Sequence, residues 1–523
     1  MTSVRAYVAI DIGTSAVKSG VIGRSGEVLG TASCGYDLFY PSADRVEADP
    51  QAYWDATVSA VREALSAARG RSGEEVEIAG VCASCQGETL LCLERPDVPL
   101  GPAIVWLDNR AQAEAAEIGA AVDPDELYAR TGQTDSVATW PAAKLRWLRE
   151  HEPERFARST HFALLGDWIG ACMCGKLAAE PTLYSNTLLL DIRSRSWWDE
   201  GLALAGVDAD RLPPLTPTGT VVGGLTAQAA GLLGLPAGTP VISGALDQIA
   251  AAVGAGNIRA GIVTETTGTV LALTATLEGP VPPRSSGLPV YVHAVPERFC
   301  VLPYVQTGGA VLQWLRRMLE PGSVDDSDYE SLIAEAARLS PGADGVTFLP
   351  HLAGAAFPEF DMRARGAIVG LTLRHDRAYV TRAALEAVAY GLRQALESLA
   401  GMGMRPSELL SLGGAARNDV WRQMKADVCG LPLRRISHPE ASLLGAAMLA
   451  SVAVGDYPDL AGAVSGMTRY LDAAVPDPDV EQLYADGYRR YRQLEATLRP
   501  YWQWEAPCDD AARSSSQNSG VST

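Results

Sequence analysis

The amino-acid sequence predicts an α/β protein built from two related lobes. Strand and helix patterns alternate along the chain, which is typical of a sheet covered by helices. Two similar strand–turn–strand segments, with turns at 13–15 and 267–269, lie far apart in the chain. A length of 523 residues and 47% hydrophobic residues are enough for two large cores.

The first lobe is expected to begin with a buried strand at 7–12, a tight turn at 13–15 and a returning strand at 17–22. Further strands are predicted at 76–84 and 90–93. Helical patterns lie at 50–68, 108–121, 142–150 and 160–172, and Pro50 suits the first turn of its helix.

The second lobe follows a predicted strand at 240–244 and a short helix at 247–255. The segment 262–275 repeats the opening pattern of strand, turn and strand. Long helices are predicted at 310–319, 329–339, 377–399 and 420–429. The end of the chain is polar and rich in serine, so we expect a disordered tail there.

Charge and composition exclude some classes of partner. The chain has 43 Lys and Arg against 62 Asp and Glu, a net charge of −19, which argues against nucleic acid or an anionic membrane as the main partner. A nucleotide stays compatible, because a few backbone N–H groups can bind phosphates. Nine scattered cysteines and an N-terminus without a signal pattern predict a cytoplasmic protein with reduced thiols.

Both turns have residues that suit phosphate binding. A glycine in such a turn lets backbone N–H groups point at an anion, and Thr and Ser hydroxyls add donors. Asp11, at the end of the first strand, could hold Mg²⁺ beside the phosphates. Glu265, before the second turn, is awkward for an anion site and either faces away or helps bind Mg²⁺ through water. One such turn alone could be an ordinary tight turn, whereas two suit a phosphate clamp between lobes.

Two further segments have alternative interpretations. Asp247 follows a predicted strand and begins a helix, so it is either a helix cap or a general base that deprotonates an attacking hydroxyl. The segment 412–418 is glycine-rich and precedes a helix. It is either an ordinary loop or a backbone open enough for a flat ring to lie on.

These segments resemble motifs of the FGGY carbohydrate kinases, the family of glycerol kinase, xylulokinase, gluconokinase and ribulokinase. The resemblance spans about residues 6–500. It includes the segments 11–18, 144–151, 244–248, 348–350, 366–371, 383–386 and 413–415. Thr139 and Tyr379 depart from the family signatures, outside the proposed chemistry.

The resemblance implies two actin-like ATPase (ribonuclease H-like) lobes, each with a mixed five-stranded sheet, closing over a deep interdomain cleft. The expected boundaries are 1–256 for the N-terminal lobe with the sugar site, 257–505 for the C-terminal lobe with the ATP site, and 506–523 for a disordered tail.

The resemblance also implies residue roles for ATP and Mg²⁺. Asp247 would be the base and Asp11 the Mg²⁺ partner. The residues expected to hold phosphates are Gly13, Thr14, Ser15, Lys18, Thr267, Gly268 and Thr269. Those expected to contact the nucleotide are Gly309, Gln313, Gly413, Gly414 and Asn418.

The substrate side matches neither familiar pattern. Residues 84–87 read Ser-Cys-Gln-Gly where xylulokinases usually have Gln-Met-His-Gly. Residues 86–89 read Gln-Gly-Glu-Thr where glycerol kinases have Gln-Arg-Glu-Thr, while 106–110 and 365–374 look closer to the xylulokinase-like branch. Glu88 is either an acceptor for substrate hydroxyls or a solvated loop carboxylate. The residues expected to bind substrate are Gln86, Gly87, Glu88, Trp106 and Gln248.

We therefore expect ATP-dependent phosphorylation of a primary hydroxyl of a small neutral sugar or polyol. A pentulose such as xylulose is favoured over an aldonate, because a carboxylate and an amide suit neutral hydroxyls. Glycerol or another short polyol is the alternative acceptor. An actin-like nucleotide-dependent switch is the non-enzyme alternative, and it would not need a base at position 247. The expected partner is a small molecule, and neither nucleic acid nor a membrane is expected. A homodimer is compatible with the sequence.

Overall fold

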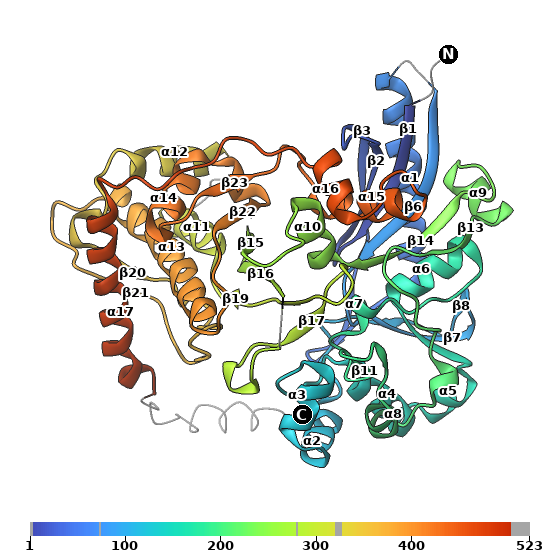
Figure 1. The fold of residues 1–523 in the computed structure, drawn as a ribbon. Helices are drawn as coiled ribbons and strands as arrows, with labels where there is room; N and C mark the ends of the chain where they lie inside the picture. The colour runs from blue at the N-terminus through green and yellow to red at the C-terminus, as the bar shows by residue number, and fades with distance from the viewer. Residues whose placement is uncertain (1–3, 73–74, 279–280, 320–326, 504–523) are drawn as a thin grey trace, which may run out of the picture.

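The computed structural model describes residues 4–72, 75–278, 281–319 and 327–503. Two large sheets form the centres of two lobes (Figure 1). The first sheet has the order β13-β14-β6-β1-β2-β3. Its strands are β1 (Val4–Ile12), β2 (Ala16–Gly23), β3 (Val28–Gly35), β6 (Val76–Cys85), β13 (Val221–Gly224) and β14 (Pro240–Leu246).

The second sheet has the order β17-β18-β16-β15-β22-β23, and β19 pairs with β16. Its strands are β15 (Ile262–Thr267), β16 (Leu271–Leu277), β17 (Val290–Val292), β18 (Phe299–Val301), β19 (Tyr304–Val305), β22 (Glu408–Leu412) and β23 (Leu433–Arg435). The two-lobed α/β architecture expected from the sequence is confirmed. The sheets have six and seven strands instead of five, because short edge strands extend each one.

Smaller sheets complete the strand inventory. One contains β4 (Phe39–Ser42), β5 (Arg45–Ala48), β7 (Leu90–Arg95), β8 (Val98–Pro99), β9 (Ala103–Ile104) and β10 (His161–Leu164). The others pair β11 (Leu190–Asp191) with β12 (Ser196–Trp197), and β20 (Thr347–Leu349) with β21 (Ala367–Val369).

Helices cover the sheets of both lobes. Those of the first half of the chain are α1 (Pro50–Ser72), α2 (Gln112–Ala121), α3 (Pro124–Thr131), α4 (Pro141–His151), α5 (Pro153–Arg158), α6 (Leu165–Cys174), α7 (Pro181–Tyr184), α8 (Asp199–Ala205), α9 (Ala227–Leu233) and α10 (Asp247–Ala255). Those of the second half are α11 (Ala310–Leu319), α12 (Ser327–Ala337), α13 (Arg377–Gly401), α14 (Asp419–Cys429), α15 (Ala441–Ala453), α16 (Leu460–Met467) and α17 (Glu481–Gln503).

Two predicted helices were wrong in part. A single helix was expected at 160–172, but its first residues form β10, and α6 begins only at Leu165. The reason is sheet pairing: β10 lies antiparallel to β7, with His161 opposite Leu93 and Leu164 opposite Leu90. Asp167 then accepts a hydrogen bond from the Leu164 N–H and begins the helix. Similarly, the helix expected from residue 108 begins at Gln112, because Asp108 is held in the preceding loop by Arg110.

The two lobes interlock through α10 and α15. In Figure 1, α15 and α16 lie beside the first sheet although they follow the second in the chain. The crossing is close, since a Cβ on Gly254 would lie 2.0 Å from the Ala441 carbonyl oxygen and one on Gly445 1.9 Å from that of Ala250. Only glycine fits at these two positions.

The sequence-based lobe boundary at 256/257 falls in the short connection between α10 and β15, and we keep it as a proposal. The expected disordered tail at 506–523 lies outside the described residues. Within the described ranges, the helices are all too short or too polar to cross a membrane. The cytoplasmic location and the homodimer stay predictions.

Candidate active site

The site on the first lobe is built on three neighbouring parallel strands. β6 lies between β1 and β14 and is parallel to both. Asp11 of β1 and Ala245 of β14 are both in register with Ser84 of β6. The segments that follow the strands therefore meet at one edge of the sheet, where open α/β sheets bind ligands. They are the 13–15 turn, the 86–88 loop and Asp247.

Asp11 is half-buried at this edge and its carboxylate is held by two serines. Its Oδ1 accepts a hydrogen bond from Ser84 and its Oδ2 accepts one from Ser442 of α15, each at 2.8 Å. Burial raises the pKa of Asp11, while the hydroxyls of Ser442 and Ser84 act in the opposite direction. The carboxylate is thus fixed in direction by one group from each half of the chain.

Asp247 begins α10 directly after the end of β14. Burial and the nearby charge of Asp11 raise the pKa of Asp247 to about 7. Its Oδ1 accepts a hydrogen bond of 2.6 Å from the N–H of Gln248, whose side chain is exposed at the start of the helix. A carboxylate with such a pKa can accept a proton near neutral pH.

The 86–88 loop lies between these two carboxylates. Gln86 is buried, and its backbone N–H donates to the Ile12 carbonyl, which ties the loop to the end of β1. Gly87 lies against Leu246, since a Cβ there would be 3.1 Å from its side chain. Glu88 accepts a hydrogen bond from Asn186, and the charge of Asp247 further raises its burial-shifted pKa. Glu88 is therefore not a solvated loop carboxylate.

Trp106 joins the substrate side to the first phosphate turn. Its indole N–H donates to the Thr14 hydroxyl at 3.1 Å, and its backbone N–H donates to the Thr89 hydroxyl. Tyr36 also donates to the Gly13 carbonyl. The turn that is expected to hold phosphate is thus braced by residues of the substrate side.

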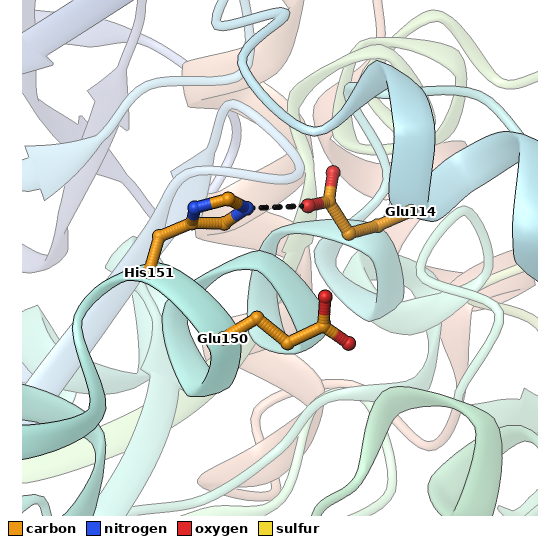
Figure 2. Close-up of side chains that lie close together, drawn as sticks. All are labelled: Glu114, Glu150 and His151. Carbon is orange, nitrogen blue, oxygen red and sulfur yellow. Dashed lines mark hydrogen bonds and ion pairs between the residues drawn. The ribbon is translucent and has the colours of Figure 1, made fainter.

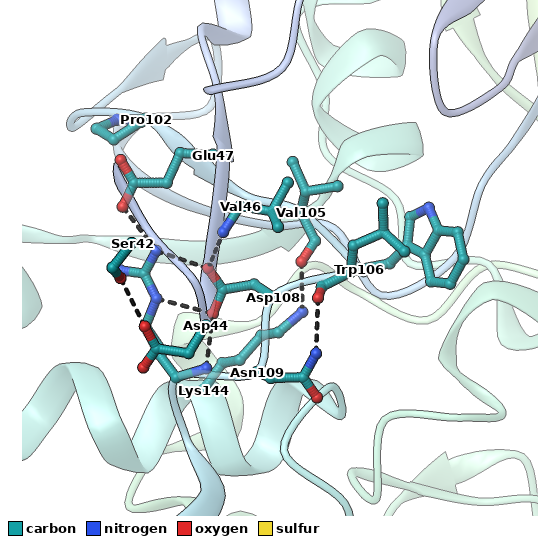
Figure 3. A network of polar contacts seen from close by, with 12 residues as sticks. Ser42, Asp44, Val46, Glu47, Pro102, Val105, Trp106, Asp108, Asn109 and Lys144 are labelled. Atoms are coloured by element: carbon teal, nitrogen blue, oxygen red, sulfur yellow. Dashed lines mark hydrogen bonds and ion pairs between the residues drawn. The ribbon is translucent and has the colours of Figure 1, made fainter. Parts of the chain in front are cut away.

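A buried polar network that includes Lys144 and Asp108 (Figure 3) contacts the 86–88 loop through the Glu88 carbonyl. Lys144 of α4 is fully buried and donates to the carbonyl oxygens of Val105 at 2.9 Å and Glu88 at 3.3 Å. Beside it, Arg110 bonds both carboxylate oxygens of Asp108 and also Glu47. Burial lowers the pKa of Lys144, and the carboxylates of Glu88 and Asp108 act in the opposite direction.

On the second lobe the equivalent turn follows β15, and its carboxylate is turned inward. Glu265 is fully buried and forms an ion pair of 2.8 Å with Lys425 of α14. The Thr267 hydroxyl donates to Glu265 and accepts from Lys425 at 2.6 Å. Glu265 therefore faces away from the cleft, and the Thr267 hydroxyl is occupied, whereas Gly268 and Thr269 are exposed.

The residues expected at the nucleotide surround this second turn. Gly309 lies directly on it, because its N–H donates to the Gly268 carbonyl at 2.6 Å. Gln313 is exposed one turn into α11. Gly413 and Gly414 follow the end of β22 next to β15, beside a cavity of about 150 Å³. The Asn418 side chain caps α14 by accepting from the Trp421 N–H.

Lys18, which was expected to hold phosphate, lies on β2 opposite Asp11. Its ammonium forms an ion pair of 2.7 Å with Glu440, which precedes α15. This pair connects the two halves of the chain next to Asp11.

A separate cluster lies away from the strand ends. Glu114, Glu150 and His151 have ligand-type atoms within 4.8 Å of one another (Figure 2). His151 already bonds Glu114 at 2.9 Å, and Glu150 pairs with Arg146. The neighbouring open groove of about 710 Å³ includes His151 but none of the expected site residues. We assign this cluster no part in the chemistry.

Sequence reasoning missed the residues that hold the site together: Ser84, Lys144, Asn186, Lys425 and Ser442. Lys144 gave the clearest signal, as a lone charge in the otherwise apolar run 141–145. The others have no local pattern, because their partners are distant in the chain.

Comparison with known proteins agrees with this geometry. Residues 6–254 match the N-terminal domain, and residues 260–454 the C-terminal domain, of the FGGY family of carbohydrate kinases. The chain is 29% identical to xylulose kinase of Escherichia coli over 96% of this chain and 99% of the relative. It is 28% identical to gluconokinase of Bacillus subtilis over 88% and 90%.

Solved structures give the same result. The structure of xylulose kinase from Rhodospirillum rubrum matches with a TM-score of 0.85 and 30% identity, over 96% of this chain and 100% of that one. Glycerol kinase of Plasmodium falciparum, at 21% identity, shares the fold with a TM-score of 0.84 over 94% and 98%. The chain belongs to the FGGY family of carbohydrate kinases and is a sugar kinase with the actin-like ATPase fold.

Proposed function

We propose that this kinase transfers the γ-phosphoryl group of ATP to a primary hydroxyl of a small neutral sugar, with a pentulose such as xylulose as the preferred acceptor. One observation carries the proposal. Asp11, the 86–88 loop and Asp247 lie at the ends of three adjacent parallel strands and so share one edge of the sheet.

In this mechanism Asp247 takes the proton of the acceptor hydroxyl, and the oxygen attacks the γ-phosphorus in line. The pKa of about 7 keeps a large share of Asp247 ionised at neutral pH and able to hold the transferred proton. Backbone N–H groups of the exposed turns at Thr14, Ser15 and Thr269 stabilise the charge that develops on phosphate oxygens.

Asp11 fits the role of Mg²⁺ partner. Its carboxylate oxygens are hard ligands of the kind that Mg²⁺ prefers, and among the described residues each receives one hydroxyl hydrogen bond. When bound, Mg²⁺ would neutralise charge on the phosphates. Glu265 does not fit this role, because Lys425 and Thr267 surround it inside the lobe.

The choice of a neutral acceptor rests on the charges around the 86–88 loop. Burial and the charge of Asp247 raise the pKa of Glu88 to about 8, so a further negative charge on the substrate would be unfavourable here, whereas neutral hydroxyls can hydrogen-bond to both groups. Relatives named xylulose kinase and gluconokinase have similar identity, so the identities do not separate these substrates. Glycerol is the second candidate, because Glu88 occurs in the glycerol kinase pattern of residues 86–89.

A coupled assay of ADP release tests the proposal directly. D-Xylulose, D-ribulose, glycerol and D-gluconate are compared by kcat/KM at the same ATP and Mg²⁺ concentrations. We expect a pentulose to exceed gluconate by about 100-fold or more, since a site built around hydroxyl contacts rejects a mismatched group strongly. A preference for gluconate would overturn the acceptor, and a preference for glycerol would establish the second candidate.

A further inference from the structure

Glu88 is held both at its backbone and at its side chain. Its backbone has a φ of 62°, in the left-handed region that residues other than glycine rarely adopt. Its carbonyl accepts a hydrogen bond from buried Lys144, and its carboxylate Oε1 accepts one from the amide of Asn186. Such constrained backbone is held only where its surroundings determine it, and is frequent at functional sites.

Asn186 lies on a segment that is itself rigid. The carbonyl of Ser185 before it accepts from Gln133 at 2.8 Å, and that of Thr187 after it accepts from the Ala142 N–H at 3.1 Å. The preceding helix α7 is also bonded to β14, because the Thr182 hydroxyl accepts a hydrogen bond of 2.8 Å from the Leu246 N–H. Asn186 is therefore held in a fixed place relative to the residue before Asp247.

The chemistry of the contact determines how the Asn186 amide is turned. The Asn186 NH₂ group faces Glu88 and donates to its Oε1, which acts as the acceptor. The Oδ1 of Asn186 is then buried without a hydrogen-bond partner among the described residues. A buried acceptor left unpaired is unfavourable. Packing alone would be served better by an apolar residue, so the contact with Glu88 is what asparagine provides at this position.

We propose that Asn186 is a positioning residue for the acceptor. It occupies one carboxylate oxygen of Glu88 and so directs the other toward a neutral substrate hydroxyl beside Asp247. The substrate class that fits is a polyhydroxylated neutral molecule whose hydroxyl groups donate to Glu88. This inference rests on the kinase function proposed above.

A double-mutant cycle tests whether Asn186 acts through Glu88. In the wild-type background, Asn186→Ala and the isosteric Asn186→Asp should raise the KM for the preferred sugar by about tenfold, the size expected for the loss of one hydrogen bond. The KM for ATP should stay unchanged. In the Glu88→Ala background, Asn186→Ala should have little further effect on the sugar KM, because contacting residues are not additive.

A swapped variant separates positioning from folding. E88Q/N186D can restore the hydrogen bond with donor and acceptor exchanged, so it should recover melting temperature relative to N186D alone. It moves the carboxylate away from the 86–88 loop, so the sugar KM should stay high. Asn109→Ala is the matched control, since the side chain of this exposed asparagine donates to the nearby Leu107 carbonyl, and it should leave the sugar KM unchanged.

The outcomes are distinct. Equal effects of Asn186→Ala with and without Glu88, no effect at all, or recovery of the sugar KM by the swap would each overturn the positioning role. No change of sugar KM in Glu88→Ala would instead refute the acceptor pocket of the proposed function, and the inference with it.

Discussion

The two turns that we propose for phosphate binding follow similar strands, but the carboxylates before them have opposite environments. In the first lobe, Asp11 lies one residue before the end of β1, is half-buried and accepts hydrogen bonds from two serine hydroxyls. In the second lobe, Glu265 lies inside β15, is fully buried and is neutralised by Lys425. The first carboxylate is available to a ligand and the second is part of the core.

A carboxylate that precedes a glycine turn is therefore not by itself a metal ligand. The position along the strand decides which way the side chain points, since successive residues of a strand face opposite sides. Asp11 stands two residues before Gly13, whereas Glu265 stands three residues before Gly268. The second lobe uses its acid to fix the turn, and the first uses its acid in the chemistry we propose.

Breaking the buried pair should give the largest loss of stability. Lys425→Met leaves Glu265 buried without its cation, and such a loss typically costs about 3–5 kcal/mol. We expect a large fall in the free energy of unfolding, measured by denaturant titration. The double variant with Glu265→Met removes both charges and should regain much of the loss. A change below about 1 kcal/mol in Lys425→Met would show that the pair does not support the turn.

Asp11→Asn should instead change the metal dependence. We expect the Mg²⁺ concentration for half-maximal turnover to rise by about tenfold or more, the usual scale for changes around a metal site. Glu265→Gln is the matched control on the other turn, and its Mg²⁺ dependence should equal that of the wild type. If both variants shift equally, or if Asp11→Asn does not shift, the contrast between the turns is wrong.

The smallest effect is expected at the partly exposed pair of Lys18 and Glu440. Lys18→Met should lower the free energy of unfolding by less than about 1 kcal/mol, because solvent screens such pairs. Any loss should shrink further as salt is added. A loss as large as that in Lys425→Met would mean that this pair locks the two halves together.

Local patterns were enough to predict β1, β2, β6, β7, β14, β15 and β16, the main helices and the two turns, whereas other strands of the large sheets, such as β3, β22 and β23, were not predicted. Asp11 and Asp247 were predicted as site residues because each lies at the end of a predicted strand, and the 86–88 loop was predicted from its resemblance to family motifs. The strand β10 was missed because its pairing with β7 is tertiary. Local sequence could not predict the roles of Lys425, Ser442 and Asn186, because the partner of each lies far away in the sequence. Pairing across the fold, and not the local sequence, assigns those roles.

The central claim is that Asp247 is the base of a sugar kinase. The most direct measurement is the turnover of Asp247→Asn with saturating sugar and ATP, alongside the binding of each substrate by calorimetry. We predict that turnover falls by about 10²–10⁴-fold while both dissociation constants stay close to those of the wild type, because amide and carboxylate have the same shape but only the carboxylate takes a proton. Turnover close to the wild-type value in Asp247→Asn would contradict the claim.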